Sequence, residues 1–359
     1  MGQTVVRARL ADIAAAAGVS KSLASRVLNG YADVAREETR RRVLEAAQRL
    51  QYMPSAAALA VAGAPTRALA FLVPPLSNPV YVRIVRGAFH EALKHGIVIV
   101  IVEDVDANQA MEAILRLCRA GRIDGVLMAS ACSRHPLVAW LRDGDVPHVF
   151  VNRAVSRSRH NVVMNDGEAS ELAWRHLWNL GHQDVGLIAG PSDIEPARRR
   201  EQAFRRAAAR SGREIAVEHV PFSEDGGAAG LNALLSRRPT LTAVFSSSLS
   251  QAMGALGAAA TNGVAIPERL SLITYDDLPT ADYLTPPLTT VRMPLAELGA
   301  AAVTAVVAQI NGVKANGQVV EAPPELIVRS STAAPGPARD RTRVVASAPR
   351  KRSEHETGE

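Results

Sequence analysis

The first fifty residues carry apolar side chains at the spacing of short helices. Apolar residues at positions 10, 13, 14 and 17 share one helical face. Gly18, which readily adopts the left-handed conformation, is expected to end this helix. Ser20 is a residue type that caps the start of a helix, and the helix after it would bury Ala24, Val27 and Leu28. Two short helices joined by a Gly-Val-Ser turn predict a helix-turn-helix unit.

A third helix is predicted from about Arg36 to Gln51, and Pro54 ends it. Its expected buried face consists of Val43, Leu44, Ala47 and Leu50. Residues 55–62 are rich in alanine and predict a further helical piece, which the Gly-Ala-Pro run at 63–65 closes as a linker.

Beyond residue 67 the pattern changes to short β-rich runs separated by helix-length segments. The runs begin at residues 68, 97, 125, 148, 184, 243 and 270. Alternating strands and helices are typical of parallel sheets with helices on both faces. So many strands predict two such sheets, with a ligand cleft at the carboxyl ends of their strands. From Ser331 onward the chain has no periodicity, and we expect residues 331–359 to be disordered.

Composition supports a globular protein of two or three domains, with 359 residues of which 47% are apolar. No apolar run approaches the roughly 18 residues of a membrane span, so no membrane partner is expected. Arg7, Arg9 and Asp12 precede any apolar run and argue against a signal peptide. Because Cys118 and Cys132 are too few for a disulfide framework, a reducing cytoplasm is the expected location.

The net charge of +6 is concentrated at the two ends of the chain. Residues 1–63 hold nine Lys or Arg against five Asp or Glu, and residues 331–359 hold six against four. The stretch between them is balanced. A basic head on a neutral body is the electrostatic pattern of a nucleic-acid reader, although solvated helices carry similar charge.

Several sequence motifs resemble those of a known protein family. The runs LADIAAAAGVSKSLASRVLNG (10–30) and EETRRRVLEAAQRLQYMP (37–54) closely resemble the DNA-binding head of the lactose-repressor (LacI/GalR) family of bacterial transcription regulators. The resemblance continues through LSNP (76–79), RIDGVLM (122–128), HLWNLGHQDVGLIAGP (176–191) and PPLTTV (286–291), and it covers the chain to about residue 330.

The resemblance implies an α/β fold in which an all-helical helix-turn-helix head precedes a body similar to periplasmic binding proteins. That body has two doubly wound parallel-sheet subdomains. The expected domains are the head at 1–54, the hinge helix and linker at 55–66, the body at 67–330 and the tail at 331–359. Within the body, subdomain one covers about 67–165 and 292–320, and subdomain two covers about 166–291 and 321–330, with crossovers near residues 165, 291 and 320.

In the head, the second helix would present its first turn to the major groove. Lys21 and Ser22 should then reach base edges, and Arg26, one turn later, should also point at bases. The residues expected to bind phosphates are Ser20, Ser25, Asn29, Thr39 and Arg40. The alternative is that these polar residues merely solvate a small helical bundle.

The hinge departs from the family pattern, which has an Arg and, two residues later, a Leu that wedges between base pairs in the minor groove. This chain has Leu59 and Val61 at those positions. Val61 is therefore expected to contact DNA as a shorter wedge, and Leu59 removes a cation from the phosphate surface.

The resemblance also implies an effector cleft. The family's effector-binding Arg is matched with Arg198, its stacking aromatic with Phe222, its cleft-lining Asp with Asp276, and a further cleft aromatic with Tyr81. Three positions where relatives have an acid instead hold Pro75, Asn152 and Leu249. Since sugars are bound largely by such acceptors, their loss favours an anionic effector, with Arg198 and Arg153 as anchors.

Enzyme motifs are missing: the sequence has no P-loop, GxGxxG after a strand, HExxH or GxSxG. We expect no enzyme activity, no cofactor and no metal site. The predicted function is a ligand-responsive transcriptional regulator, a repressor of a carbohydrate or sugar-acid utilisation operon. It would bind a pseudo-palindromic operator in double-stranded DNA as a homodimer, with a tetramer as the alternative assembly. The alternative function is a solute-binding or receptor module that uses the same body without DNA.

Overall fold

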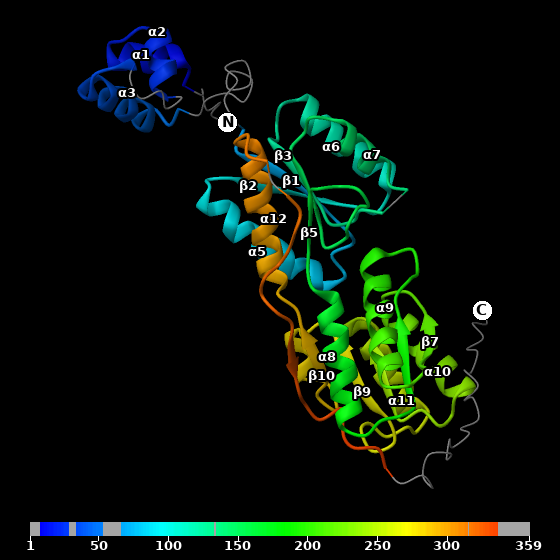
Figure 1. The fold of residues 1–359 in the computed structure, drawn as a ribbon. Coiled ribbons are helices and arrows are strands. Elements are labelled where there is room, and N and C mark those ends of the chain that lie inside the picture. Colours follow the sequence, from blue (N-terminus) through cyan, green and yellow to red (C-terminus); the bar gives the residue numbers. More distant parts are fainter. Residues whose placement is uncertain (1–7, 29–33, 53–65, 133, 315, 337–359) are drawn as a thin grey trace, which may run out of the picture. The chain divides into compact units, whose positions relative to one another are not determined.

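The computed structural model describes residues 8–28, 34–52, 66–132, 134–314 and 316–336 (Figure 1). The N-terminal helices together with residues 115–124 form one compact unit, and the rest of the α/β part forms another. We call the N-terminal helices the head and the α/β part that follows them the body. Among the described residues, no helix is long and apolar enough to cross a membrane.

The described head consists of α1 (Leu10–Ala17), α2 (Lys21–Leu28) and α3 (Glu37–Arg49). Its small core is formed by Ile13, Ala14, Ala17, Ala24, Val27, Val43 and Ala46. Gly18 adopts the left-handed conformation with φ of 63° and ends α1, and Ser20 caps α2 by accepting the Leu23 N–H at 3.2 Å. The expected buried faces of α1 and α2 are therefore present.

The expected buried face of α3 is partly wrong. Val43 is fully buried, but Leu44 and Leu50 are 46% and 37% exposed, and Ala46 takes the inner position instead. The α3 helix touches α1 and α2 along a narrow stripe, and Leu44 lies about 100° away from Val43 around the helix. The small alanines of α1 bring the helices close, so little more than that stripe is covered.

The body contains two six-stranded sheets. Sheet A has the strand order β11-β5-β4-β3-β1-β2. Its strands are β1 (Ala68–Val73), β2 (Val98–Glu103), β3 (Gly125–Met128), β4 (His148–Val151), β5 (Asn161–Val163) and β11 (Gln318–Val319). Sheet B has the order β12-β10-β9-β8-β6-β7. Its strands are β6 (Val185–Ala189), β7 (Ala216–His219), β8 (Ala243–Ser246), β9 (Ser271–Tyr275), β10 (Thr289–Arg292) and β12 (Glu325–Ile327).

The two sheets share one winding pattern. In each, the second strand in sequence lies at one edge and the first lies beside the third, so both reverse direction at an equivalent switch point. The core strands of both sheets pair in parallel, and β12 pairs antiparallel with β10. Ligands of such sheets bind outside the carboxyl ends of the strands, next to the switch point.

Helices cover both sheets. Those of the sheet A part are α5 (Pro79–Lys94), α6 (Ala107–Arg119), α7 (Pro136–Asp143) and α12 (Leu295–Ile310). Those of the sheet B part are α8 (Asp166–Asn179), α9 (Glu195–Arg210), α10 (Glu224–Arg237), α11 (Leu249–Thr261) and the short 3-10 helix η2 (Pro279–Asp282). The chain passes between the sheets after β5, after β10 and after β11, and α12 packs beside α5 (Figure 1).

The expectation of disorder from Ser331 does not hold for residues 331–336. Ser331 is fully buried, and its hydroxyl donates to the Leu272 carbonyl at 2.6 Å. Further along, His182 Nε2 lies 2.9 Å from the Ala333 carbonyl. The segment is held by hydrogen bonds to the beginnings of the interior strands β9 and β10 of sheet B, which composition alone does not reveal. Residues 337–359 lie outside the described residues.

Candidate functional site

In the head, the residues expected to read bases share the exposed side of α2. Lys21, Ser22 and Arg26 are all exposed, whereas Ala24 and Val27 on the opposite side are buried in the core. The Ser20 cap fixes the start of the helix, so the two side chains of its first turn and Arg26 project from one defined surface. This is the arrangement that a recognition helix needs.

The residues expected to bind phosphates are placed less uniformly. Ser20 is exposed, and Ser25, Thr39 and Arg40 are half-buried. Thr39 and Arg40 lie in the first turn of α3, where backbone N–H groups also favour an anion. Asn29 and Val61 lie outside the described residues, so their contacts with DNA stay predictions.

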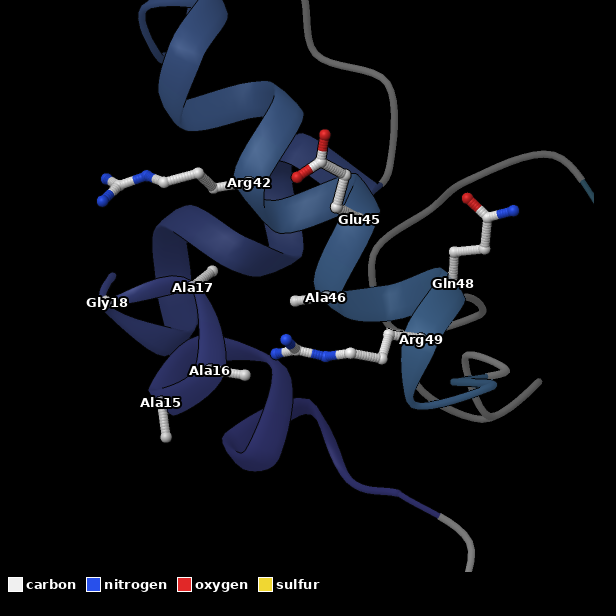
Figure 2. A pocket seen from close by; sticks show the side chains of 9 residues that line it. All are labelled: Ala15, Ala16, Ala17, Gly18, Arg42, Glu45, Ala46, Gln48 and Arg49. Carbon is white, nitrogen blue, oxygen red and sulfur yellow. The ribbon is translucent and has the colours of Figure 1, made fainter.

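A groove runs between the end of α1 and α3 (Figure 2). Its volume is about 690 Å³, and small residues Ala15 to Gly18 form its α1 side. Arg42, Ala46 and Arg49 follow one face of α3, and both arginines extend in the same direction beside the α1 alanines. None of the residues expected to contact DNA lines this groove.

In the body, polar residues follow the carboxyl ends of four strands. They are Ser130 after β3, Asn152 after β4, Ser247 after β8 and Asp276 after β9. Asn152 and Asp276 are both only 3% exposed, and both have positive φ, at 67° and 75°. This backbone conformation is costly for residues other than glycine and is concentrated at ligand sites.

Each of these four residues also has a buried oxygen without a hydrogen-bond partner among the described residues. The atoms are Ser130 Oγ, Asn152 Oδ1, Ser247 Oγ and Asp276 Oδ1. An unpaired buried polar atom costs about 1–3 kcal/mol, so a group of them at one end of two sheets calls for an external partner. The arrangement fits a bound ligand or ordered water.

A charged network built on Asp166 lies beside these strand ends. Arg200 Nε donates to Asp166 Oδ1 at 2.8 Å, and its Nη1 donates to the Ser247 carbonyl at 2.8 Å. The Arg200 guanidinium lies 3.5 Å from the centre of the Tyr275 ring, and the Tyr275 hydroxyl donates to Asp166 Oδ1 at 2.7 Å. Arg199 Nη2 donates to Asp166 Oδ2 at 2.6 Å and to the Asn152 carbonyl at 3.0 Å. One carboxylate therefore serves two arginines.

The protonation of Asp276 differs from that of an ordinary carboxyl group. Burial raises its pKa to about 6, and the neighbouring Asp166 adds to this effect while Arg200 opposes it. Asp276 is thus a weaker acid than an ordinary carboxyl group, and with a pKa of about 6 it is mostly ionised at pH 7 and becomes protonated as the pH falls below 6.

Arg153 and Tyr81 lie together on the sheet A side. Tyr81 is 6% exposed, and Arg153 Nη2 lies 3.5 Å from its hydroxyl. Arg153 Nη1 also approaches the Ser130 carbonyl at 3.4 Å, while its Nε is buried without a partner among the described residues. No carboxylate of the described residues forms an ion pair with Arg153; the nearby Asp104 is paired with His135 at 3.0 Å.

A small cavity of about 180 Å³ opens near these groups. It is lined by residues of both sheet parts, among them Asn78, Ser248, Leu249 and Asp276. The ring of Phe222 lies against Gly190, where a Cβ would come within 2.1 Å of it. Phe222 is half-buried, which leaves part of its face accessible.

Arg198 is placed differently from the expectation. Its side chain is exposed, donates to the Ser192 carbonyl at 3.0 Å, and lines a separate cavity of about 470 Å³ with Cys132, Arg157 and Glu195. Two residues later, Arg200 turns inward with the buried Ala197, Phe204 and Ala207 of α9. The helical spacing 197, 200, 204 and 207 could have identified Arg200 from the sequence.

Asp166 had no distinct signal in the sequence beyond its place at the first residue of a helix. It is 1% exposed and holds both arginines. Among the described residues, no group of three or more His, Cys, Asp or Glu could hold a metal ion.

Comparison with known proteins identifies the class of protein. Residues 9–55 match the model of bacterial regulatory proteins of the lacI family, and residues 174–332 match the periplasmic binding protein-like domain. The chain therefore belongs to the LacI family of bacterial transcription regulators.

Named relatives agree along nearly the whole chain. The HTH-type transcriptional repressor PurR of Edwardsiella ictaluri is 31% identical, over 91% of this chain and 97% of its own length. The HTH-type transcriptional regulator MalR of Streptomyces coelicolor is 32% identical, over 91% and 98%. The solved complex of the transcriptional regulator CelR with cellobiose is 28% identical, with a TM-score of 0.70, over 90% and 100%.

Proposed function

We propose that the protein is a repressor whose affinity for a pseudo-palindromic operator is set by a small anionic effector bound at the strand ends of the body. The genes it controls would serve the use of a sugar acid or a phosphorylated sugar. Family membership supports the regulatory role. The proposal that the effector is an anion rests on Arg153. This cation has a buried Nε without a hydrogen-bond partner and has no carboxylate partner among the described residues.

The charges around the unpaired oxygens favour an anion. Arg199 and Arg200 both pair with Asp166, and Arg199 also pairs with Glu195 at 3.4 Å, so these two arginines are already matched by carboxylates. Arg153 is the arginine of this group that has no ion pair among the described residues, and the nearby Asp104 is already paired with His135. A carboxylate or phosphate would complete the hydrogen bonds of Arg153, and a charge-assisted contact of this kind contributes about 1.5–3 kcal/mol.

The other contacts of the effector follow from the same surroundings. Tyr81 and Phe222 would cover an apolar face of the ligand, and Asp276 would accept from a hydroxyl. Arg200 replaces Arg198 in this proposal, because Arg200 is 6% exposed and lies beside Ser247, whereas Arg198 points outward.

The cavity next to Asp276, at about 180 Å³, is smaller than the roughly 300–1,000 Å³ typical of ligand pockets. An effector of sugar size would therefore enter only if the two sheet parts separate. Such a ligand favours one arrangement of the sheet parts over another, and this preference is what changes operator affinity.

A binding screen tests the effector class. Isothermal calorimetry would compare neutral sugars with their acid and phosphate forms, using the parent protein, Arg153→Met and Arg198→Met. We expect an anionic form to bind best, Arg153→Met to weaken it about 10- to 150-fold, and Arg198→Met to leave it unchanged. Tighter binding of a neutral sugar, unaffected by Arg153→Met, would contradict the proposal; CelR was solved with such a ligand, cellobiose.

Homodimerisation has support in the apolar surface of the sheet A part. Phe89 and Leu93 on α5 are 47% and 55% exposed, and Val98 on the edge strand β2 is 64% exposed. An apolar helix face next to an open strand edge is typical of an interface. We expect Leu93→Glu to shift sedimentation toward the monomer and to weaken operator binding, whereas Arg116→Glu on the exposed side of α6 would do neither.

The same proposal places the protein in the cytoplasm, where its operator is, and assigns it no catalytic activity. Tetramer formation stays an alternative that the same sedimentation experiment separates from a dimer.

A further inference from the structure

A cavity of about 440 Å³ lies away from the carboxyl ends of the strands, at the start of β4 and the end of α12. Its charged lining residues are Arg142, Asp145, Arg159 and Lys314. Three cations thus face one carboxylate. His148 and His160 complete the titratable groups that line it.

The two histidines form a chain of hydrogen bonds with defined protons. His148 Nδ1 lies 2.8 Å from the Val146 carbonyl, and since a carbonyl only accepts, Nδ1 carries the hydrogen. Neutral His148 then accepts at Nε2, which lies 3.2 Å from His160 Nδ1. His160 must therefore donate from Nδ1, and its remaining nitrogen Nε2 is an acceptor.

This chain of hydrogen bonds can take up one proton without breaking. The hydrogen between His160 Nδ1 and His148 Nε2 can lie on either nitrogen, so the added proton is accommodated at His160 Nε2. A proton on His160 Nε2 leaves both hydrogen bonds intact, and no described residue forms a hydrogen bond with that atom. Gln309 holds His148 in place, accepting its N–H at 3.1 Å and donating to its carbonyl at 2.9 Å.

Without a ligand the pair is neutral near pH 7. Burial lowers the pKa of His148, although the hydrogen bond to Val146 opposes this, and burial also lowers the pKa of His160. The surrounding cations do not stabilise a positively charged imidazole. An anion in the cavity would reverse this balance, because it neutralises the arginines and attracts a proton to His160.

We propose that this cavity is a second anion site, separate from the effector cleft, that binds a tetrahedral dianion, free or as a phosphate ester, together with a proton on His160. Arg142, Arg159 and Lys314 supply the charge, and the histidine pair links occupancy to pH. This proposal does not depend on the identity or the binding site of the proposed effector.

Sulfate is the suitable probe, because it stays a dianion throughout this pH range and any proton taken up comes from the protein. Calorimetry on the full-length protein would measure its affinity at pH 6.0 and pH 8.0, in two buffers with different ionisation enthalpies. We expect binding about 3- to 10-fold tighter at pH 6.0, with proton uptake approaching one. Ribose 5-phosphate in place of sulfate would show whether an ester binds better than the free ion.

Three variants assign the result to the site. His160→Asn keeps an N–H donor toward His148 but cannot be protonated, so the pH dependence should disappear while binding persists. Arg159→Gln combined with Lys314→Met should weaken sulfate about tenfold at both pH values. Arg116→Gln, an exposed arginine elsewhere, should change nothing.

Opposite results would overturn the proposal. If Arg159→Gln/Lys314→Met binds sulfate normally and Arg153→Met does not, the anion lies in the effector cleft. If His160→Asn keeps the full pH dependence, the proton goes elsewhere. Circular dichroism of each variant confirms that it is folded before it is compared.

Discussion

At the scale of single residues, the arginines of the head differ in where they lie. Arg26 is exposed on the outer face of α2, and Arg40 is half-buried in the first turn of α3. A side chain on the recognition helix can grip a guanine edge with two hydrogen bonds, whereas one beside a helix start meets phosphates that are alike in every sequence.

We therefore expect Arg26→Ala to reduce the ratio of operator to non-operator affinity by about 5- to 150-fold. Arg40→Ala should weaken both duplexes alike and reduce the slope of log affinity against log salt by about two for a dimer. Fluorescence anisotropy with DNA from upstream of its own gene and a scrambled duplex measures both. Arg49→Ala, in the groove of Figure 2, is the matched control; equal loss on both duplexes in Arg26→Ala would count against the docking.

Asp276 gives a prediction about stability and pH. Its pKa of about 6 lies above the ordinary value of 3.8, so the folded protein binds the proton more tightly than the unfolded chain. The stabilisation from this group is complete below pH 3.8 and is lost as the pH rises through 6, a change on the order of 3 kcal/mol.

Asp276→Asn should therefore be more stable than the parent at pH 7 by up to that order, and the difference between the two should shrink as the pH falls toward 4. Urea denaturation of both proteins across this range measures the difference directly. A difference that is constant with pH would show that Asp276 is ionised normally in the folded state.

The site illustrates what a sequence does and does not reveal about single residues. Tyr81, Phe222 and Asp276 could be nominated from motifs, and they stay proposals for effector contact. The resemblance points to Arg198, but the three consecutive arginines at 198–200 match the motif equally in type. Only the direction in which each projects from α9 separates them, and that depends on which face of the helix packs on sheet B.

At the scale of elements, strongly apolar segments are predictable from the sequence, and segments with few apolar residues are not. The strands predicted at 68, 97, 125, 148, 184, 243 and 270 are all present, whereas β5, β7, β10, β11 and β12 are not among the predicted runs. The strands β7, β11 and β12 have few buried residues. Such strands owe their conformation to pairing with a neighbour, which periodicity within one segment cannot show.

The close contact of α5 with α12 gives a prediction at this scale. A Cβ on Gly299 of α12 would lie 2.0 Å from the Ile84 carbonyl of α5, and one on Gly87 would lie 2.0 Å from the Ala296 carbonyl. Backbone atoms cannot yield as a flexible side chain can, so even Gly299→Ala forces the two helices apart.

We expect Gly299→Ala to lower the free energy of unfolding by about 1–3 kcal/mol. Gly257 in α11 is the control, because a Cβ there meets nothing within 4 Å. Gly257→Ala should instead stabilise by about 0.5–1 kcal/mol through helix propensity. Chemical denaturation compares them, and similar stabilisation by both substitutions would show that the helices are not in the contact described.

At the scale of the whole molecule, regulation requires the body to have two arrangements that the effector distinguishes. Among the described residues, two hydrogen bonds join the sheet A part to α9: Glu195 accepts the Ala154 N–H at 3.1 Å, and Arg199 donates to the Asn152 carbonyl at 3.0 Å. Glu195 also lies 3.4 Å from Arg199, so it positions both contacts. Any change of arrangement must break or rebuild them.

We therefore expect Glu195→Ala to change the coupling between effector and operator more than it changes effector binding to the free protein. Coupling is reciprocal, so the factor by which saturating effector alters operator affinity must equal the factor by which saturating operator alters effector affinity. Both factors, commonly 5- to 150-fold in such systems, can be measured by anisotropy and calorimetry. Glu171→Ala, which removes a surface ion pair with Arg210, should keep the parent factor. An unchanged factor in Glu195→Ala would show that these contacts persist in both arrangements and that the two states differ elsewhere in the body.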